Sequence, residues 1–202
     1  MADMKKLAMG AEATIYLDRD PVLAKEIIKK TRHKKSYRHP ELDQQLRKRR
    51  TRNEARLLHQ AKSAGVRVPF IHDIDMEACS ISMEYIRGDR LRDVMNEELA
   101  REVGRIIGRL HKADIIHGDL TTSNMLLAEK GIVLIDLSLG EISDDLEAKG
   151  VDLHVLAENI KAIHTNIEFQ LVIEGYKEVH DIPIMEKIQE IEKRGRYLKK
   201  VE

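Results

Sequence analysis

Short apolar stretches alternate with turn residues in the first third of the chain. Apolar residues gather over 13–17 and 22–28, and the turn sequence Asp-Arg-Asp-Pro at 18–21 separates them. Short apolar runs bounded by turn residues predict a hairpin. Further along, Pro40 suits the first position of a helix, and no Gly or Pro follows before Gly65. The sequence therefore predicts a β-hairpin followed by one long, charged helix.

The rest of the chain shifts from strand patterns to helical ones. Strands are predicted over 70–74 and 80–86, and Gly88 breaks the pattern. Beyond it, Asn96 suits the N-cap of a helix. The apolar stripe of this helix consists of Leu99, Val103, Ile106, Ile107 and Leu110. Helical spacing also joins Val151, Val155, Leu156, Ile160 and Ile163, and then Ile184, Ile188 and Ile191. Two more helices are therefore expected.

The order of these elements predicts the fold class. Strands and one long helix come first, and the second half is mostly helical with a strand-bearing loop, which is the α+β pattern. We expect one domain with two lobes, joined by a hinge. The expected ranges are 1–83 for the N-lobe, 84–88 for the hinge, 89–192 for the C-lobe and 193–202 for a basic C-terminal tail. A cleft between the lobes is the expected ligand site.

The composition indicates the cellular environment in which the protein is expected to work. The single cysteine, Cys79, cannot form an intrachain disulfide, so we expect a reducing, cytoplasmic environment. No apolar run approaches the ~20 residues that cross a bilayer, and the Met1 start lacks the apolar segment of a signal peptide. We therefore expect a soluble protein without a membrane partner.

Charge is balanced overall but unevenly distributed. Segment 29–56 holds twelve Lys or Arg against three acidic residues, whereas 136–152 holds six acidic residues against one lysine. This asymmetry predicts separate patches for an anionic partner and for cations. Any one of these runs also fits a solvated helix face.

The candidate chemistry lies in one stretch of the second half. Asp119 is followed by Asn124, and an apolar strand over 132–135 ends at Asp136. Two strands that bracket a turn would bring Asn124 and Asp136 to neighbouring strand ends. Amide and carboxylate oxygens so placed suit Mg²⁺, which prefers a few protein oxygens together with substrate phosphates. Asp119 would then accept a proton from an attacking hydroxyl, or orient it.

The spacing of these residues matches a known pattern. The sequence HxDxxxxN over 117–124, followed twelve residues later by an aspartate, has the order of the protein-kinase catalytic loop and metal-binding segment. The sequence DLSLG over 136–140 resembles the DFG element of kinases. A turn cap is the simpler interpretation of either carboxylate alone. The combination favours a kinase-like, bilobal fold.

Other kinase parts are expected at matching positions. A phosphate-covering loop is expected at Gly10, Ala11, Glu12 and Ala13, although this loop keeps one glycine of the GxGxxG pattern. Lys25, Lys29 and Lys30 compete for the role of the strand lysine, and Glu54 on the long helix is its expected partner.

Two further groups complete this set. Met83, Glu84 and Ile86 would form the hinge, where main-chain groups of Glu84 and Ile86 would bind adenine. Asp152, near the start of a predicted helix, is either a helix cap or a brace for the catalytic loop. His117 is expected to support that loop.

Beyond kinases in general, the sequence resembles the small atypical kinase subunit of the KEOPS complex, whose nearest relatives in organisation are RIO-type kinases. The resemblance covers nearly the whole chain. Four segments carry it: GAEA at 10–13, KSYRHPELD at 35–43, RTRNEAR at 50–56 and HGDLTTSN at 117–124.

This resemblance implies roles for single residues. It implies ATP with Mg²⁺ as cofactors, Mn²⁺ being an alternative metal, with Asp119 as the catalytic aspartate and Asn124 and Asp136 as metal ligands. In the family the strand lysine stands seven residues before the tyrosine of KxYRHP, which selects Lys30 in a KxR pattern completed by Arg32. Lys29 remains the alternative.

The resemblance also implies a function. It implies an ATPase, with autophosphorylation as a side activity, that works beside the threonylcarbamoyl transferase subunit and other KEOPS subunits to make threonylcarbamoyladenosine on tRNA. Thr121 stands where many protein kinases have a phosphate-steering lysine, and no APE element lies between Asp136 and Asp152. Efficient phosphorylation of free proteins is therefore not expected.

Two alternatives remain: a nucleotide-sensing scaffold in the same complex and a small-molecule phosphotransferase. The basic tail is the expected contact for tRNA phosphates. Its cations are Lys193, Arg194, Arg196, Lys199 and Lys200.

Overall fold

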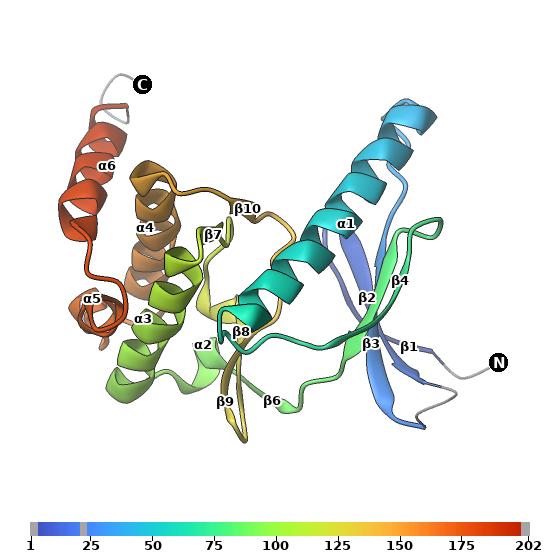
Figure 1. The fold of residues 1–202 in the computed structure, drawn as a ribbon, viewed down its shortest axis with the longest axis horizontal. Coiled ribbons are helices and arrows are strands. Elements are labelled where there is room, and N and C mark those ends of the chain that lie inside the picture. Colours follow the sequence, from blue (N-terminus) through green and yellow to red (C-terminus); the bar gives the residue numbers. More distant parts are fainter. Residues whose placement is uncertain (1–3, 21–23, 199–202) are drawn as a thin grey trace.

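The computed structural model describes residues 4–20 and 24–198. Figure 1 shows a strand-rich N-terminal lobe beside a mostly helical C-terminal lobe, with the long helix α1 crossing the N-terminal lobe toward the junction. This arrangement confirms the predicted α+β architecture. No helix within the described residues carries an apolar stretch long enough to cross a membrane.

The N-terminal lobe is built on a five-stranded antiparallel sheet with the order β1-β2-β3-β5-β4. Its strands are β1 (Lys5–Met9), β2 (Ala13–Arg19), β3 (Glu26–Arg32), β4 (Ile71–Asp75) and β5 (Ser80–Glu84). The predicted hairpin is present, but β3 begins at Glu26 rather than at residue 22, and Lys25 lies outside it. Strand β1 was not predicted, because all five of its residues are exposed and no apolar alternation marks it.

Helix α1 (Pro40–Ser63) has the limits that its end signals predict. Pro40 occupies the first turn, and Gly65 follows the helix with a φ of +77°, a conformation that favours glycine. Its C-terminal half buries Leu57, Leu58 and Ala61 in the main core. The middle of the helix buries a charged residue, Glu54, which an apolar stripe alone would not predict.

The C-terminal lobe contains α2 (Leu91–Val94), α3 (Glu97–Lys112), α4 (Leu146–Ile163), α5 (Phe169–Lys177) and α6 (Ile184–Leu198). The Asn96 side chain caps α3 by accepting a hydrogen bond from the Leu99 N–H at 2.9 Å, as predicted. Helices α3 and α5 pack backbone to backbone. A Cβ on Gly104 would lie 2.0 Å from the Val172 carbonyl oxygen, so this contact requires glycine.

Short strands position the loops of this lobe. A three-stranded sheet joins β6 (Gly88–Arg90), β8 (Met125–Ala128) and β9 (Gly131–Leu134), and β7 (Ile115–Ile116) pairs with β10 (Glu141–Ile142). A 3₁₀ turn spans Thr122–Asn124.

Two helices of this lobe extend past the apolar residues that predict them. Helix α4 begins at Leu146 and is capped by Asp145, so Asp152 lies in its second turn and is not a helix cap. Helix α6 continues to Leu198, so the expected tail starts inside a helix. A helix extends in this way when the polar residues at its ends also favour helix.

Candidate active site

Lys30, Glu54 and Asp136 meet in the space between the two lobes. The Lys30 Nζ lies 2.7 Å from Glu54 Oε1 and 3.0 Å from Asp136 Oδ2. Strand β3 supplies the lysine, α1 the glutamate, and the segment after β9 the aspartate. Successive side chains of a strand point to opposite faces, so Lys29 projects away from Glu54. The geometry therefore pairs Lys30 with the helix glutamate.

Lys30 and Asp136 each favour the charged form of the other. Burial lowers the pKa of Lys30, but the carboxylates of Glu54 and Asp136 raise it more, and the net shift is upward. Burial raises the pKa of Asp136. The charge of Lys30 and the hydrogen bonds from Ser138, whose N–H lies 2.9 Å from Asp136 Oδ1, lower this pKa by more, so the net shift is downward. Both groups are therefore charged near neutral pH.

A fourth charged residue, to which the sequence assigned no role, joins this group. The Arg32 Nη2 lies 2.6 Å from Glu54 Oε2, and the Arg32 side chain is 3% exposed. The available sequence signal is the spacing: residues 30 and 32 of a strand face the same side.

The β8–β9 hairpin brings Asn124 and Asp136 together as predicted. Asn124 directly precedes β8, Asp136 follows β9, and Met125 pairs with Leu134. The Ile135 N–H donates to the Asn124 carbonyl oxygen at 3.0 Å, which joins the two strand ends.

The side chains at these strand ends suit a divalent cation that is shared with a substrate. The Asn124 Nδ2 donates to Asp119 Oδ2 and to the Asp119 main-chain oxygen, both at 2.9 Å, which turns the amide oxygen away from Asp119. Within the described residues no group of three or more His, Cys, Asp or Glu could hold a metal. A partial set of one amide and one carboxylate fits Mg²⁺, which keeps waters and substrate phosphates as its other ligands.

The segment just before Asp119 is held by Asp152. Its Oδ2 accepts from the His117 N–H at 2.8 Å, and its Oδ1 accepts from the Gly118 N–H at 2.9 Å. His111 lies 3.2 Å from the same carboxylate through Nε2, and its Nδ1 lies 3.2 Å from the Tyr176 hydroxyl. The expected bracing contact is therefore present in the structure, extended by two residues that the sequence did not indicate.

Gly118 and His117 shape the turn before Asp119. Gly118 has a φ of +80°, and a Cβ there would lie 2.2 Å from the Leu139 carbonyl oxygen, so only glycine fits. The buried His117 ring accepts from the Asp119 N–H through Nδ1 at 3.3 Å. Burial lowers the pKa of His117. Asp119 itself is exposed beside Asn124.

The expected phosphate-covering loop is the turn between β1 and β2. The Gly10 N–H donates to the Ala13 carbonyl oxygen at 2.9 Å, which closes the turn. Glu12 pairs with Arg50 of α1, and this hydrogen bond lowers the pKa of Glu12. The Ala11 carbonyl oxygen accepts from Lys35. The loop is thus tied to α1 by Arg50 and to the segment before α1 by Lys35.

The expected hinge lies at the end of β5 and just beyond it. Met83 is buried in the N-lobe, the Glu84 N–H donates to the Phe70 carbonyl oxygen at 2.8 Å, and Ile86 makes no main-chain hydrogen bond with any described residue. Glu84 and Ile86 line a cavity of about 1060 Å³. This cavity contains neither Lys30 nor the residues 119, 124 and 136.

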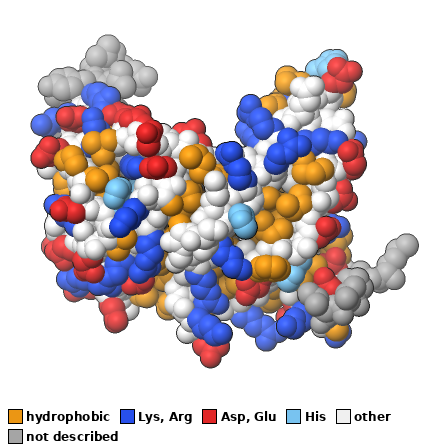
Figure 2. Space-filling model, in the orientation of Figure 1, with side chains coloured by type: hydrophobic (Ala, Val, Ile, Leu, Met, Phe, Trp, Pro, Cys, Tyr) orange, Lys and Arg blue, Asp and Glu red, His pale blue; other side chains and the backbone are white. Residues whose placement is uncertain are grey.

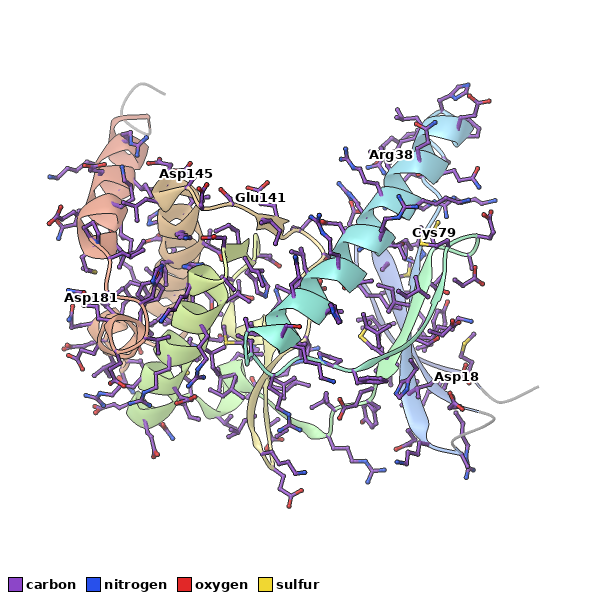
Figure 3. The ribbon with its side chains drawn as sticks, viewed as in Figure 1. Asp18, Arg38, Cys79, Glu141, Asp145 and Asp181 are labelled. Carbon is purple, nitrogen blue, oxygen red and sulfur yellow. The ribbon has the colours of Figure 1, made fainter. Side chains whose placement is uncertain are left out.

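The charge patches follow the sequence asymmetry. Figure 2 shows Lys and Arg side chains along α1. Arg49, Arg52 and Arg56 of this helix are exposed. Figure 3 places Glu141 and Asp145 on the neighbouring edge of the C-lobe, at β10 and at the start of α4.

The expected tail is described only in part. Lys193 is exposed, and the Arg194 Nη2 lies 2.6 Å from Glu147 Oε1. Arg196 lies on α6, and Lys199 and Lys200 lie outside the described residues.

The fold and this arrangement of residues define a protein-kinase-like protein of the RIO type. A family model described as the RIO domain matches residues 22–165. The solved structure of the Rio2 kinase from Chaetomium thermophilum superposes with a TM-score of 0.68 at 13% identity, covering 94% of this chain and 71% of that one.

Similarity to curated proteins identifies a smaller family within the RIO type. The KEOPS complex subunit Bud32 of Pyrococcus abyssi is 45% identical over 96% of both chains. A probable serine/threonine-protein kinase BUD32 homolog of Archaeoglobus fulgidus is 40% identical over 97% of this chain and 98% of its own. This chain therefore belongs to the RIO-domain family and, within it, to the family of the KEOPS subunit Bud32.

The chain also matches part of longer proteins. A probable bifunctional tRNA threonylcarbamoyladenosine biosynthesis protein of Methanothermobacter thermautotrophicus is 47% identical over 95% of this chain. The chain spans 36% of the length of that relative.

Proposed function

We propose that this protein is a Mg²⁺-dependent ATPase and atypical serine/threonine kinase that acts in a cytoplasmic KEOPS complex during threonylcarbamoyladenosine modification of tRNA. The observation that carries the proposal is the convergence of Lys30, Glu54 and Asp136 between the lobes, with Asn124 and Asp119 beside them. The names of its relatives, KEOPS subunit Bud32 and a tRNA threonylcarbamoyladenosine biosynthesis protein, support the assignment to this complex.

Each residue of the site has a role in this proposal. Lys30 binds phosphate oxygens of ATP, while Asp136 and the amide oxygen of Asn124 hold Mg²⁺. The metal, when bound, neutralises charge on the phosphates. Asp119 is exposed next to Asn124 and orients the attacking water or hydroxyl.

The main chain contributes the remaining contacts. The turn of Gly10, Ala11, Glu12 and Ala13 covers the phosphates, and its tie to α1 through Glu12 and Arg50 keeps it in place. The Glu84 carbonyl oxygen and the Ile86 N–H bind adenine. Met83, the third hinge residue, contributes to the N-lobe core beside them.

The metal carboxylate provides the direct test. Asp136→Ala should lower the rate of MgATP hydrolysis about 100-fold or more, since the phosphate charge loses its preorganised compensation. Asp144→Ala, which removes an exposed carboxylate from the same acidic segment, is the matched control and should hydrolyse ATP at the parental rate. Equal turnover in both variants would reject the site.

A nucleotide-sensing scaffold is the second candidate function. Two observations favour it: Thr121 in place of a phosphate-steering lysine, and the start of α4 only ten residues after Asp136, which leaves little room for a peptide-docking segment. Asp119→Asn discriminates between the two. Full tRNA modification by a reconstituted KEOPS complex that carries this variant favours the scaffold, and a loss favours the catalyst.

The basic C-terminal segment is the proposed contact for tRNA phosphates. Arg194 pairs with Glu147, so it should stay unchanged while the other cations are tested. Replacing Lys193, Lys199 and Lys200 by Gln should weaken tRNA-stimulated ATPase more than basal ATPase, most clearly at low salt. A control replaces three exposed lysines elsewhere, Lys112, Lys161 and Lys177. Equal effects on both activities, or equal effects of both sets, would count against the proposal.

A further inference from the structure

Glu54 is held by two cations rather than one. Its Oε1 faces Lys30 at 2.7 Å and its Oε2 faces Arg32 at 2.6 Å. Glu54 is 0% exposed and the Arg32 side chain 3%. Water therefore cannot replace either partner, and a buried carboxylate that loses its counter-charge is strongly destabilised.

The group is neutral only when all four charges are counted. Lys30 and Arg32 carry two positive charges, and Glu54 and Asp136 carry two negative charges. Lys30 is the shared member, because its Nζ contacts both carboxylates, whereas Arg32 has Glu54 as its only ion-pair partner among the described residues. The two cations are therefore not equivalent.

This difference matters when a triphosphate enters, a step that rests on the proposed function. The phosphates would attract the Lys30 Nζ, and a cation would draw the Asp136 carboxylate away from it. If Lys30 were the sole partner of Glu54, it would have to neutralise a buried carboxylate and the incoming phosphates together. Arg32 removes that conflict, since it keeps Glu54 paired whatever Lys30 binds.

We propose that Arg32 is a positioning residue that clamps Glu54, and with it α1, independently of Lys30, so that the Lys30 Nζ is free to bind nucleotide phosphates. The sheet fixes the main chain of Arg32. Arg32 is the last residue of β3, opposite Ala13 of β2, and its N–H donates to the Cys79 carbonyl oxygen at 3.1 Å. The helix is thereby attached to the sheet through a second cation besides Lys30.

The first experiment measures KM and kcat for MgATP hydrolysis by the full chain. Arg32→Met should raise KM for ATP about tenfold with a smaller change in kcat, because Glu54 then ties down Lys30. Lys29→Met is the matched control: it removes the same charge from the same strand, and Lys29 forms no ion pair with any residue that the structure describes. KM should therefore stay within about twofold. Arg32→Lys keeps the charge and should restore most of the affinity. Equal KM values for Arg32→Met and Lys29→Met would overturn the proposal.

The second experiment needs no nucleotide. Arg32→Met and Glu54→Gln should each lower the melting temperature, and the double variant should melt above Glu54→Gln alone, because it no longer buries an unpaired guanidinium. Strictly additive losses would show that Arg32 does not act through Glu54. If the parental protein fails to bind MgATP, the result rejects both the proposed function and the proposal that Arg32 leaves Lys30 free to bind phosphates. The melting data still decide whether Arg32 holds Glu54.

Discussion

The two lobes each bury one carboxylate near the site, and they stabilise it in different ways. Glu54 in the N-lobe is 0% exposed and is matched by the charged side chains of Lys30 and Arg32. Asp152 in the C-lobe is 2% exposed and is matched by two main-chain N–H groups and the His111 ring. The first arrangement uses charges on side chains, and the second uses mainly dipoles fixed in the backbone.

This difference fits the tasks of the two regions. A charge cluster can redistribute when an anion and a cation arrive, because each side chain can change partner. A carboxylate that binds the N–H groups of His117 and Gly118 cannot let go without distorting the turn that carries Asp119. If the proposed function holds, we expect the N-lobe cluster to respond to a ligand and the Asp152 network to stay rigid.

Matched amide substitutions test the comparison most strongly. Glu54→Gln should cost about 3–5 kcal/mol of unfolding free energy, because it leaves two buried cations with one remaining carboxylate. Asp152→Asn keeps an acceptor for one main-chain N–H and should cost about 1–3 kcal/mol. Urea unfolding at one pH and ionic strength measures both. The exposed Glu98→Gln is the control and should change stability by less than about 0.5 kcal/mol.

The order of the two losses is the informative result. An Asp152→Asn loss that equals or exceeds the Glu54→Gln loss would mean that the C-lobe carboxylate also depends on its charge, and the contrast between the lobes would disappear.

The pH dependence of stability is expected to show a further property of the C-lobe, because its buried His117 has a lowered pKa. Burial lowers its pKa from 6.5, with a smaller contribution from His111, and the opposing carboxylates of Asp152, Asp136 and Asp119 do not offset this. A histidine with a lowered folded pKa stays neutral while the unfolded chain takes up a proton. Its contribution to stability is therefore complete above pH 6.5 and falls below it.

Each pH unit below this value should cost up to about 1.4 kcal/mol for this group until the folded pKa is reached. Urea unfolding at pH 7.5 and pH 5.5 measures the loss, and His117→Leu should show a smaller difference between the two values. An unchanged difference in the variant would assign the pH dependence to other groups, of which His164 and His180 also have lowered pKa values.

The smallest expected effect lies at the outer end of the Asp152 network. Tyr176→Phe removes the hydroxyl that lies 3.2 Å from His111 Nδ1 and should cost about 1 kcal/mol. The ATPase rate should stay close to the parental value, because the N–H contacts of Asp152 remain. A large loss of activity with little loss of stability would show that the Tyr176 hydroxyl affects catalysis in addition to stabilising the fold.

Local signals in the sequence determined much of the fold and of the loop chemistry. Pro40 and Gly65 set the ends of α1, Asn96 set the start of α3, and the order of Asp119, Asn124 and Asp136 predicted a hairpin that joins two strand ends. These features depend on helix caps, turn conformations and apolar periodicity, all of which act over a few residues.

The tertiary structure alone decided which charges meet. The choice of Lys30 over Lys29 and the pairing of Arg32 with Glu54 depend on how β3 faces α1 across 22 to 24 residues of chain. The attachment of His111 and Tyr176 to Asp152 likewise depends on how α3, α4 and α5 pack. Neither has a local signature, because an ion pair or a buried hydrogen bond reflects the distance between side chains in space and not their spacing along the chain.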